Sequence, residues 1–307
     1  RSSDLEEWTF DWRKLNCDHR SSFHVRREKF DEMLLRHAQS QGVKVHEGIS
    51  VTKIHFEGER PIAADWQSDG AVESGCIGFD FVIDCSGRSG ILATRYLESR
   101  RFLSAFQNVA IWSYFRGGGR PQTEFDGPLT LVSVPHGWIW YIPIEKDVHS
   151  VGLVCHADYF KQAKTEKSVE AIYRDAIALS PLLSQLLEPA EQTTGIYVER
   201  DYSYSSDRLA GPGYFLCGDA GCFIDPLLSS GVHLAMHSAT MAAAIGPEPP
   251  QHGQVVLYRR PLEHRARTRK GLRILVFRTL VEQLHALTEI PLEELDPEGW
   301  ATDDDWE

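Results

Sequence analysis

One segment of the chain, residues 214–232, combines the residue types of a ligand-binding turn. Gly218 and Gly231 allow the backbone to approach a ligand closely, and the Asp219 carboxylate can accept hydrogen bonds from sugar or ribityl hydroxyls. The backbone amides near Ser230 and Gly231 are expected to open a helix, whose positive end favours an anion. The segment therefore fits a ligand with both hydroxyl groups and negative charge, although Gly-Asp-Ala alone is equally typical of a tight turn before any helix.

Two tryptophans, Trp138 and Trp140, are separated by one residue in the run Gly-Trp-Ile-Trp-Tyr-Ile-Pro at residues 137–143. Side chains alternate between the two faces of a strand, so both indoles are predicted to share one face of a sheet. Taken alone, the pair is explained by ordinary packing on that face.

The histidines and cysteines do not form a metal-binding pattern. None of the 13 histidines belongs to an HExxH or other paired spacing, so no metal site is predicted. The six cysteines are scattered without a CxxC pair, which indicates reduced thiols rather than a disulfide framework. Cys217 and Cys222 flank the Gly-Asp turn and are interpreted as small packing residues, not as a redox pair.

Helix and strand patterns surround these segments. Apolar residues at helical spacing predict a helix over residues 28–41, and period-two alternation predicts a small antiparallel meander over 43–70. The apolar run 79–85 predicts a buried strand that ends at a glycine-rich turn, the place where open α/β sheets bind ligands. The remaining predictions are strands at 109–115, 129–134, 138–144, 151–156, 195–200 and 214–217, and helices at 167–187 and 230–244.

Composition excludes several classes of function. The chain has 307 residues and a net charge of −12, which disfavours a nucleic-acid partner bound through phosphates. No apolar stretch reaches the length of a membrane-spanning helix and no signal-peptide core is visible, so a cytoplasmic protein is expected. Residues 259–278 are basic and predict an amphipathic helix, which could meet a membrane surface or a partner. A solvated helix face, compensated by the acidic tail, is the favoured interpretation.

The whole segment 214–232 resembles the FAD-ribityl motif of the flavin monooxygenase superfamily. Residues 22–31 are similar to that family's Arg-x-x-Phe-Asp motif, in which the residue matching Arg27 lies near the FAD pyrophosphate. Residues 81–90 are similar to its Asp-Gly strand end. The resemblance implies FAD as cofactor, with Arg27, Gly218, Asp219, Pro226 and Gly231 as cofactor-binding residues.

Within this superfamily, residues 138–143 match the Trp-x-Trp-x-Ile-Pro signature of flavin-dependent halogenases, with Trp138 and Trp140 as the signature residues. Tryptophan halogenases carry a glutamate where this chain has Leu228. The Ser-Ser-Gly-Val-His string that follows resembles halogenases of phenols or of aromatic and pyrrolyl groups bound to a carrier protein. By the same resemblance, the amides of Ser230 and Gly231 hold chloride.

The resemblance also implies partners and architecture. A separate flavin reductase supplies reduced FAD, and the substrate is a small aromatic, free or carrier-bound. The predicted fold class is α/β (α+β), an N-terminally incomplete Rossmann-like FAD-binding domain with an antiparallel-sheet substrate domain and C-terminal helices. The predicted division is a partial FAD-binding domain at 1–105, a β-rich substrate domain at 106–200, a return to the FAD-binding domain at 201–245 and a helical region at 246–307.

One expected element is absent from the sequence. The family's Gly-x-Gly-x-x-Gly turn, which holds the ADP half of FAD, does not occur in these 307 residues. The family's active-site lysine belongs to the same early region, so no catalytic residue is assigned here. The expectation is a fragment, or a naturally truncated protein that is compromised in FAD binding. An aromatic hydroxylase of the same fold and a non-catalytic remnant stay open as alternatives.

Overall fold

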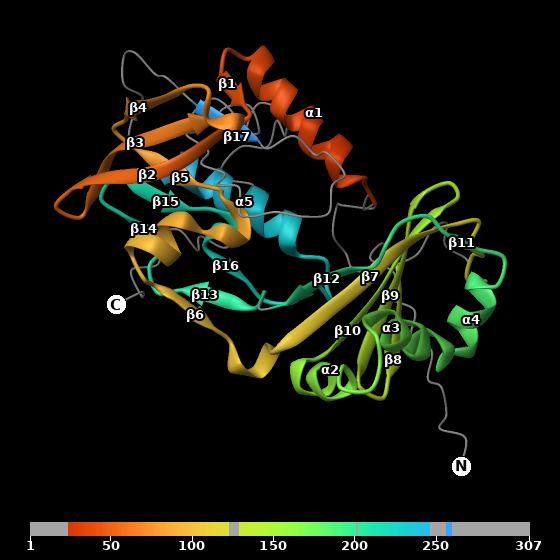
Figure 1. The fold of residues 1–307 in the computed structure, drawn as a ribbon. Coiled ribbons are helices and arrows are strands. Elements are labelled where there is room, and N and C mark those ends of the chain that lie inside the picture. The colour runs from red at the N-terminus through yellow and green to blue at the C-terminus, as the bar shows by residue number, and fades with distance from the viewer. Residues whose placement is uncertain (1–23, 123–128, 201, 246–255, 260–307) are drawn as a thin grey trace, which may run out of the picture. The chain divides into compact units, whose positions relative to one another are not determined.

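The computed structural model describes residues 24–122, 129–200, 202–245 and 256–259 (Figure 1). The chain divides into two compact units. The first unit comprises residues 1–30, 111–153 and 168–197, and the second comprises 31–110, 154–167 and 198–307. Among the described residues, no helix combines the length and the apolar composition needed to cross a bilayer.

The first unit is built on a six-stranded sheet, to which β7 and β10 contribute most of their length. The strand order is β11-β7-β10-β9-β8, and β12 pairs with β7. Strands β8 and β9 form an antiparallel hairpin in which Val134 faces Gly137. The strands are β7 (Asn108–Arg116), β8 (Thr130–Val134), β9 (Gly137–Glu145), β10 (Val148–His156), β11 (Glu191–Gln192) and β12 (Tyr197–Arg200).

Two helices, α3 (Val169–Ala178) and α4 (Pro181–Leu187), replace the single helix predicted for residues 167–187. The break falls at Ser180, whose hydroxyl accepts a hydrogen bond from the Leu183 amide at 3.2 Å and caps α4. Pro181 is the first residue of α4, and a helix tolerates proline only in its first turn, so a new helix must begin here. The predicted helical region is therefore confirmed, and the structure divides it into two helices at Ser180.

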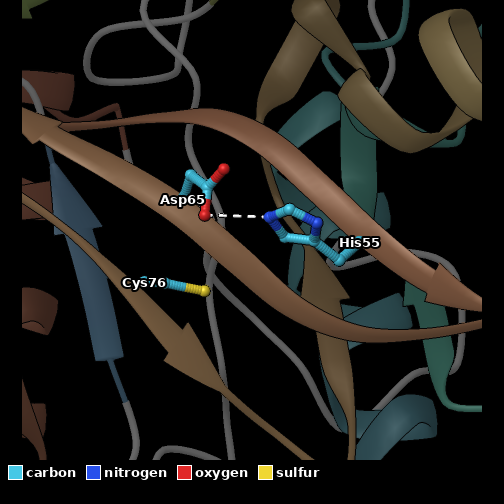
Figure 2. A group of neighbouring side chains, drawn as sticks. All are labelled: His55, Asp65 and Cys76. Atoms are coloured by element: carbon cyan, nitrogen blue, oxygen red, sulfur yellow. Dashed lines mark ion pairs between the residues drawn. The ribbon is translucent and has the colours of Figure 1, made fainter.

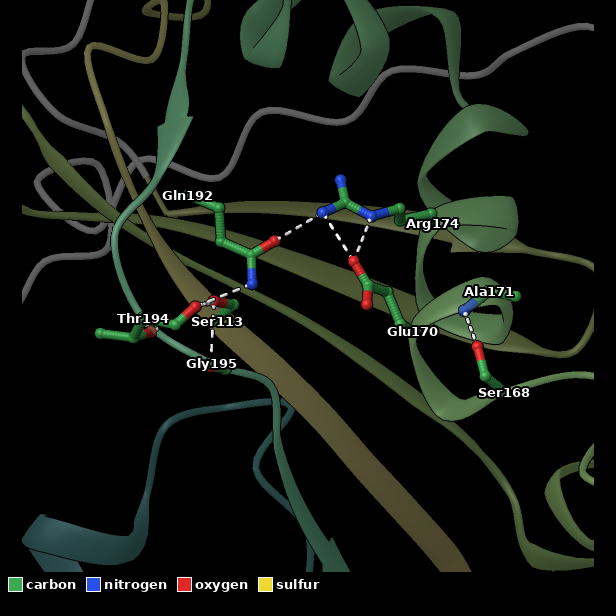
Figure 3. A network of polar contacts seen from close by, with 8 residues as sticks. All are labelled: Ser113, Ser168, Glu170, Ala171, Arg174, Gln192, Thr194 and Gly195. Carbon is green, nitrogen blue, oxygen red and sulfur yellow. Dashed lines mark hydrogen bonds and ion pairs between the residues drawn. The ribbon is translucent and has the colours of Figure 1, made fainter. Parts of the chain in front are cut away.

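A polar network ties α3 to the sheet of the first unit (Figure 3). Arg174 pairs with Glu170 at 2.9 Å and donates a hydrogen bond to Gln192 Oε1, also at 2.9 Å. The Gln192 amide then donates to the carbonyl of Thr194 at 2.8 Å, and the buried Ser113 hydroxyl on β7 donates to the same carbonyl. Because the network links α3, β11 and β7, it holds the helix and two strands in one arrangement.

The second unit contains several small sheets. Strands β2, β3 and β4 form an antiparallel meander, so the predicted hairpin within residues 43–70 is confirmed. The prediction was wrong about the first strand, since β1 pairs in parallel with β17, and it did not include β4. Strands β5 and β15 are parallel neighbours, with β14 beside β15, and β13 lies between β16 and β6. The elements are α1 (Arg27–Ser40), whose first residues belong to the first unit, β1 (Lys44–Glu47), β2 (Ile49–Glu57), β3 (Arg60–Ser68), β4 (Ser74–Gly78), β5 (Val82–Asp84), β6 (Arg100–Phe102), α2 (Ala157–Ala163), β13 (Tyr204–Ser206), β14 (Ala210–Gly211), β15 (Tyr214–Leu216), β16 (Cys222–Phe223), α5 (Gly231–Ile245) and β17 (Val256–Arg259), which pairs with β1.

The predicted buried strand at 79–85 is shorter in the structure but is buried on both faces. Val82 packs in a cluster with Ile54 and Leu216, whereas Ile83 packs in another cluster with Cys217. A strand covered on both sides reads as a continuous apolar run, which explains the pattern in the sequence. The mixed fold of helices and antiparallel sheets is confirmed. The predicted basic helix and acidic tail lie outside the described residues, apart from Arg259 at the end of β17.

The cluster around Ile54 anchors the meander to the strands β5 and β15. Replacing Ile54, which is 2% exposed, by alanine should lower the free energy of unfolding by about 2–5 kcal/mol, because a buried cavity remains. Val72→Ala, at a side chain that is 85% exposed, is the control and should change it by less than about 0.5 kcal/mol. Denaturant unfolding of both variants tests this, and equal effects would contradict the core assignment.

Candidate functional site

The carboxyl ends of β5 and β15 lie side by side and lead into two glycine turns. Leu216 is in register with Asp84, and the next amide, that of Cys217, donates to the Asp84 carbonyl at 2.9 Å. The turns that follow are Gly87–Ser89 and Gly218–Ala220. Sequence analysis placed a ligand site at both strand ends, and the structure brings these two ends together.

The Asp84 side chain is fully buried beneath the first of these turns. Its two carboxylate oxygens accept hydrogen bonds from the amides of Ser86 at 2.8 Å and Leu92 at 2.9 Å. Burial raises the pKa of Asp84, and those hydrogen bonds together with the nearby Arg100 charge oppose the shift. Asp84 therefore fixes the backbone of the turn and does not face a ligand.

Arg100, the first residue of β6, bridges the two turns. Its guanidinium donates to the carbonyl of Arg88 at 2.5 Å and to the carbonyl of Ala220 at 3.3 Å. The same group lies 3.8 Å from the centre of the Tyr204 ring, a cation–π contact. Burial lowers the pKa of Arg100. Sequence analysis missed this residue, because nothing in its local pattern points to a partner more than a hundred residues away.

Gly218 lies where helix α5 approaches the turn most closely. Its φ is +54°, and a Cβ at this position would lie 2.9 Å from the Cβ of Ala235. Its amide donates to the Ser238 hydroxyl at 2.9 Å. The adjacent Asp219 is half-buried, and its carbonyl accepts a hydrogen bond from Tyr204 at 2.6 Å. A glycine is thus required here by both the backbone conformation and the helix contact.

The start of α5 carries three of the predicted site residues. Pro226 precedes a turn in which its carbonyl accepts from the Ser229 amide at 3.0 Å, and the Ser230 carbonyl accepts from Leu234 at 2.9 Å. Gly231 is the first residue of the helix, and it and Ser230 are half-buried. The first turn of a helix presents amides that have no partner within the helix, so this end is suited to an anion.

Trp138 and Trp140 lie on β9 in the first unit, on the same face of the sheet. The residues between and after them, Ile139 and Tyr141, are completely buried, while both indoles are half-buried. Their ring centres are 5.9 Å apart, and Trp140 Nε1 donates to the Ser150 hydroxyl at 3.1 Å. The predicted shared face is confirmed.

These indoles continue into a larger aromatic row. The Trp112 ring lies 6.5 Å from Trp140 and stacks on Tyr197 at 5.5 Å. Gly152 on β10 leaves space for the Trp140 ring, because a Cβ at this position would lie 2.0 Å from that ring. Sequence analysis did not find Trp112 or Tyr197, since they come from β7 and β12 and only strand pairing brings them to this face.

Arg27 is the first residue of α1 and is exposed. Its neighbour Arg26 is half-buried and forms ion pairs with Glu28 and, at 3.1 Å, with Glu145 at the end of β9. Lys29 also lies 3.1 Å from Glu145, and these cations lower the pKa of the Glu145 carboxyl. Sequence analysis named Arg27 and missed Arg26, whose ion pairs tie the start of α1 to β9. A role of Arg27 toward a pyrophosphate stays a prediction.

The five described cysteines are free thiols. Cys217 is buried beside Ile83, which agrees with a packing role. A hydrogen bond with Cys217, together with burial, raises the pKa of Cys85. Cys85 is therefore held as a neutral thiol in the second unit.

Parallel strands that end in glycine turns beside a helix N-terminus are typical of proteins that bind nucleotides or flavins. The sequence profile of the family described as "Tryptophan halogenase" matches residues 11–256. The chain therefore belongs to the tryptophan halogenase family, and the resemblance to flavin-dependent halogenases is confirmed.

Several relatives are named as halogenases. A tryptophan 2-halogenase of Chondromyces crocatus is 55% identical over 240 residues, which are 78% of this chain and 46% of that protein. A flavin-dependent halogenase of Penicillium aethiopicum is 39% identical over 257 residues, or 76% of this chain and 48% of that protein. The chain spans about half the length of the curated relatives it matches.

Solved structures agree with this assignment. The myxobacterial chondrochloren halogenase, described as a variant of FAD-dependent halogenases, is 33% identical, with a TM-score of 0.71 over 79% of this chain and 56% of that one. A flavin-dependent brominase is 28% identical, with a TM-score of 0.64 over 72% of this chain and 55% of that one.

The Gly218 turn can be tested by adding one methyl group. Gly218→Ala should lower the free energy of unfolding by about 2–4 kcal/mol, through the positive φ and the collision with Ala235. Gly58→Ala has a φ of +59° and open space around the new methyl, so it should cost only about 1–2 kcal/mol. Denaturant unfolding compares the two; equal losses would show that α5 does not press on the turn.

The bridge made by Arg100 gives a second test. Arg100→Met should lower the free energy of unfolding by about 2–3 kcal/mol, because the carbonyls of Arg88 and Ala220 lose a charged donor and the Tyr204 ring loses its cation. The neighbouring Arg101→Met removes an exposed ion pair with Asp207 and should cost less than about 1 kcal/mol. Thermal unfolding of both variants measures this, and an unaltered Arg100→Met protein would refute the bridge.

Proposed function

We propose that this chain forms part of a flavin-dependent halogenase that replaces a hydrogen of an electron-rich aromatic by chlorine. The observation that carries the proposal is the junction of β5, β15 and the start of α5, with the Gly-Asp turn between them. Family membership supports it, since the matched relatives are named as halogenases.

The residues at this junction fit FAD by the chemistry of their groups. We assign Asp219, a half-buried carboxylate, to the ribityl hydroxyls, and Gly218 and Pro226 to the backbone that borders the cofactor. Arg27, an exposed cation that lies outside this junction, is assigned to the pyrophosphate on the family resemblance alone. Reduced FAD, supplied by a separate flavin reductase, would provide two of the four electrons that reduce O2 to two waters. Chloride and the aromatic substrate would provide the other two as chlorine replaces one aromatic hydrogen.

Ser230 and Gly231 are the residues proposed to hold chloride. Their amides belong to the first turn of α5, and the helix dipole places partial positive charge there. Backbone amides attract a halide without offering a proton that would be consumed. The family's lysine has no counterpart among these residues, so we assign no catalytic residue to this chain.

The substrate class is a finer proposal. Leu228 is 80% exposed and has no ionisable group, so it cannot take the part of the glutamate found in tryptophan halogenases. This favours a phenol, or an aromatic group bound to a carrier protein, over free tryptophan. The relative from Chondromyces crocatus is nevertheless named a tryptophan 2-halogenase, so tryptophan must be one arm of the assay. We assign the first unit to the aromatic substrate, because it carries the signature residues Trp138 and Trp140.

The division of labour along the chain belongs to the same proposal. Residues 1–105 and 201–245 are assigned to the FAD-binding part and 106–200 to the substrate part. A cytoplasmic location is proposed because free thiols are typical of a reducing compartment.

Two variants of Gly231 separate the loss of an amide donor at the start of α5 from the effect of added side-chain volume. Gly231→Pro removes one amide donor at the first helical position, where proline fits, and should raise the KM for chloride about 10–100-fold. Gly231→Ala adds a comparable Cβ near the Phe223 ring but keeps the amide, so its KM should stay near that of the parent.

The assay supplies FAD, a flavin reductase, O2 and either a phenol, a carrier-bound aromatic or tryptophan. It is run on this chain and on a chimera that adds the part of the Chondromyces crocatus relative without a counterpart here. Chlorinated product that depends on chloride supports the proposal. Hydroxylated product formed equally well without halide identifies an aromatic hydroxylase, and absence of flavin binding in both proteins identifies a non-catalytic remnant.

A further inference from the structure

Three side chains that can ligate a metal meet on the meander of the second unit (Figure 2). They are His55 on β2, Asp65 on β3 and Cys76 on β4, one from each strand. One potential ligand atom of each lies within 4.8 Å of the other two, and His55 Nε2 is 2.8 Å from Asp65 Oδ1. No metal site was predicted from the sequence, because these three residues have no short spacing along the chain and come together only through strand pairing.

Strand pairing places these side chains on one face. Asp65 is in register with Cys76, and His55 is in register with Ala63, two residues before Asp65. Residues one position away, Ile54 and Ala64, are buried on the opposite face. Because the inner face is fixed by the core, the three ligand groups cannot turn away together without a register shift of the meander.

We propose that His55, Asp65 and Cys76 bind one Zn²⁺ ion. Imidazole nitrogen, carboxylate oxygen and thiolate sulfur are the three ligand types that zinc accepts, at about 2.0–2.3 Å from the metal. Tetrahedral coordination at those lengths separates ligand atoms by about 3–4 Å. The observed spread of up to 4.8 Å therefore needs only a small inward movement of side chains on the protein surface. The fourth position is left for water.

A nucleophilic thiol is the competing interpretation, and the contacts disfavour it. The hydrogen bond between Cys76 and Asp65, with Asp65 as the acceptor, raises the pKa of the Cys76 thiol. His55 contacts Asp65 and so acts on the carboxylate, not as a base on the sulfur. A thiol held by a carboxylate is a weak nucleophile, whereas a divalent cation can displace the thiol proton and be shared by both groups.

The charges around the cluster set the strength of binding. Hydrogen bonds with His55 and Cys76 lower the pKa of the Asp65 carboxyl, and the charge of Lys53, which is in register with Asp65, adds a smaller effect in the same direction. The Lys53 charge also repels a divalent ion, so the site is expected to bind Zn²⁺ moderately. A bound ion would cross-link three consecutive strands, and its binding free energy would add to the stability of the meander. This inference does not rest on the proposed halogenase activity.

The test uses Co²⁺ as a spectroscopic probe of the full chain, followed by displacement with Zn²⁺. One Co²⁺ per chain should bind with a thiolate-to-cobalt absorption band, and Zn²⁺ should abolish the band. Cys76→Ser should lose the band. His55→Gln should weaken Zn²⁺ binding at least about tenfold, since even loss of a group that only supports a ligand costs about 10–100-fold.

The matched control is His46→Gln, an exposed histidine on β1 that lies outside the cluster. It should keep both the band and the affinity of the parent chain. Thermal unfolding with and without Zn²⁺ gives an independent measurement, in which the parent should gain stability and Cys76→Ser should not. A band that persists in Cys76→Ser, or no cobalt–thiolate band in the folded parent, overturns the proposal.

Discussion

The parallel pairing of β5 with β15 is the constraint on which the second unit depends. It places Asp84 next to Cys217 and so brings two glycine turns to one edge, although more than a hundred residues separate them in the chain. The buried Asp84 carboxylate then fixes the first turn from below, and Arg100 ties both turns together from the side. Without this pairing, the turns Gly87–Ser89 and Gly218–Ala220 would be two unrelated loops.

The polar side chains around the two glycine turns mostly hydrogen-bond to the backbone and do not point toward the candidate site. Asp84 and Ser238 accept hydrogen bonds from backbone amides in or next to the turns, and Tyr204 donates to a turn carbonyl. Burial raises the pKa of Asp84 and of Tyr204. The groups proposed to meet a ligand are a half-buried carboxylate, backbone amides and glycine surface. This division is typical of cofactor sites, in which the protein supplies position and charge and the cofactor supplies the reaction.

In the first unit, the packing of the sheet fixes the positions of the signature residues Trp138 and Trp140. The alternation of β9 buries Ile139 and Tyr141 and leaves both tryptophans on the other face, where Trp112 and Tyr197 extend the aromatic row. The network from Ser113 through Gln192 to Arg174 holds β7, β11 and α3 in register beside it (Figure 3). The signature residues are thus part of a packed aromatic row, which agrees with both packing and a specific role.

The sequence by itself determined the family, the hairpin of β2 and β3, the doubly buried strand, the shared face of Trp138 and Trp140 and the glycine turn before α5, because each is encoded in neighbouring residues or in motif order. It did not reveal Arg100, Arg26, the aromatic partners of Trp140 or the cluster of His55, Asp65 and Cys76. Those contacts join residues that lie far apart in the chain or on different strands, and only the pairing and register of strands decide which side chains meet. Local periodicity fixes the face to which a side chain points, whereas tertiary structure decides what lies opposite it.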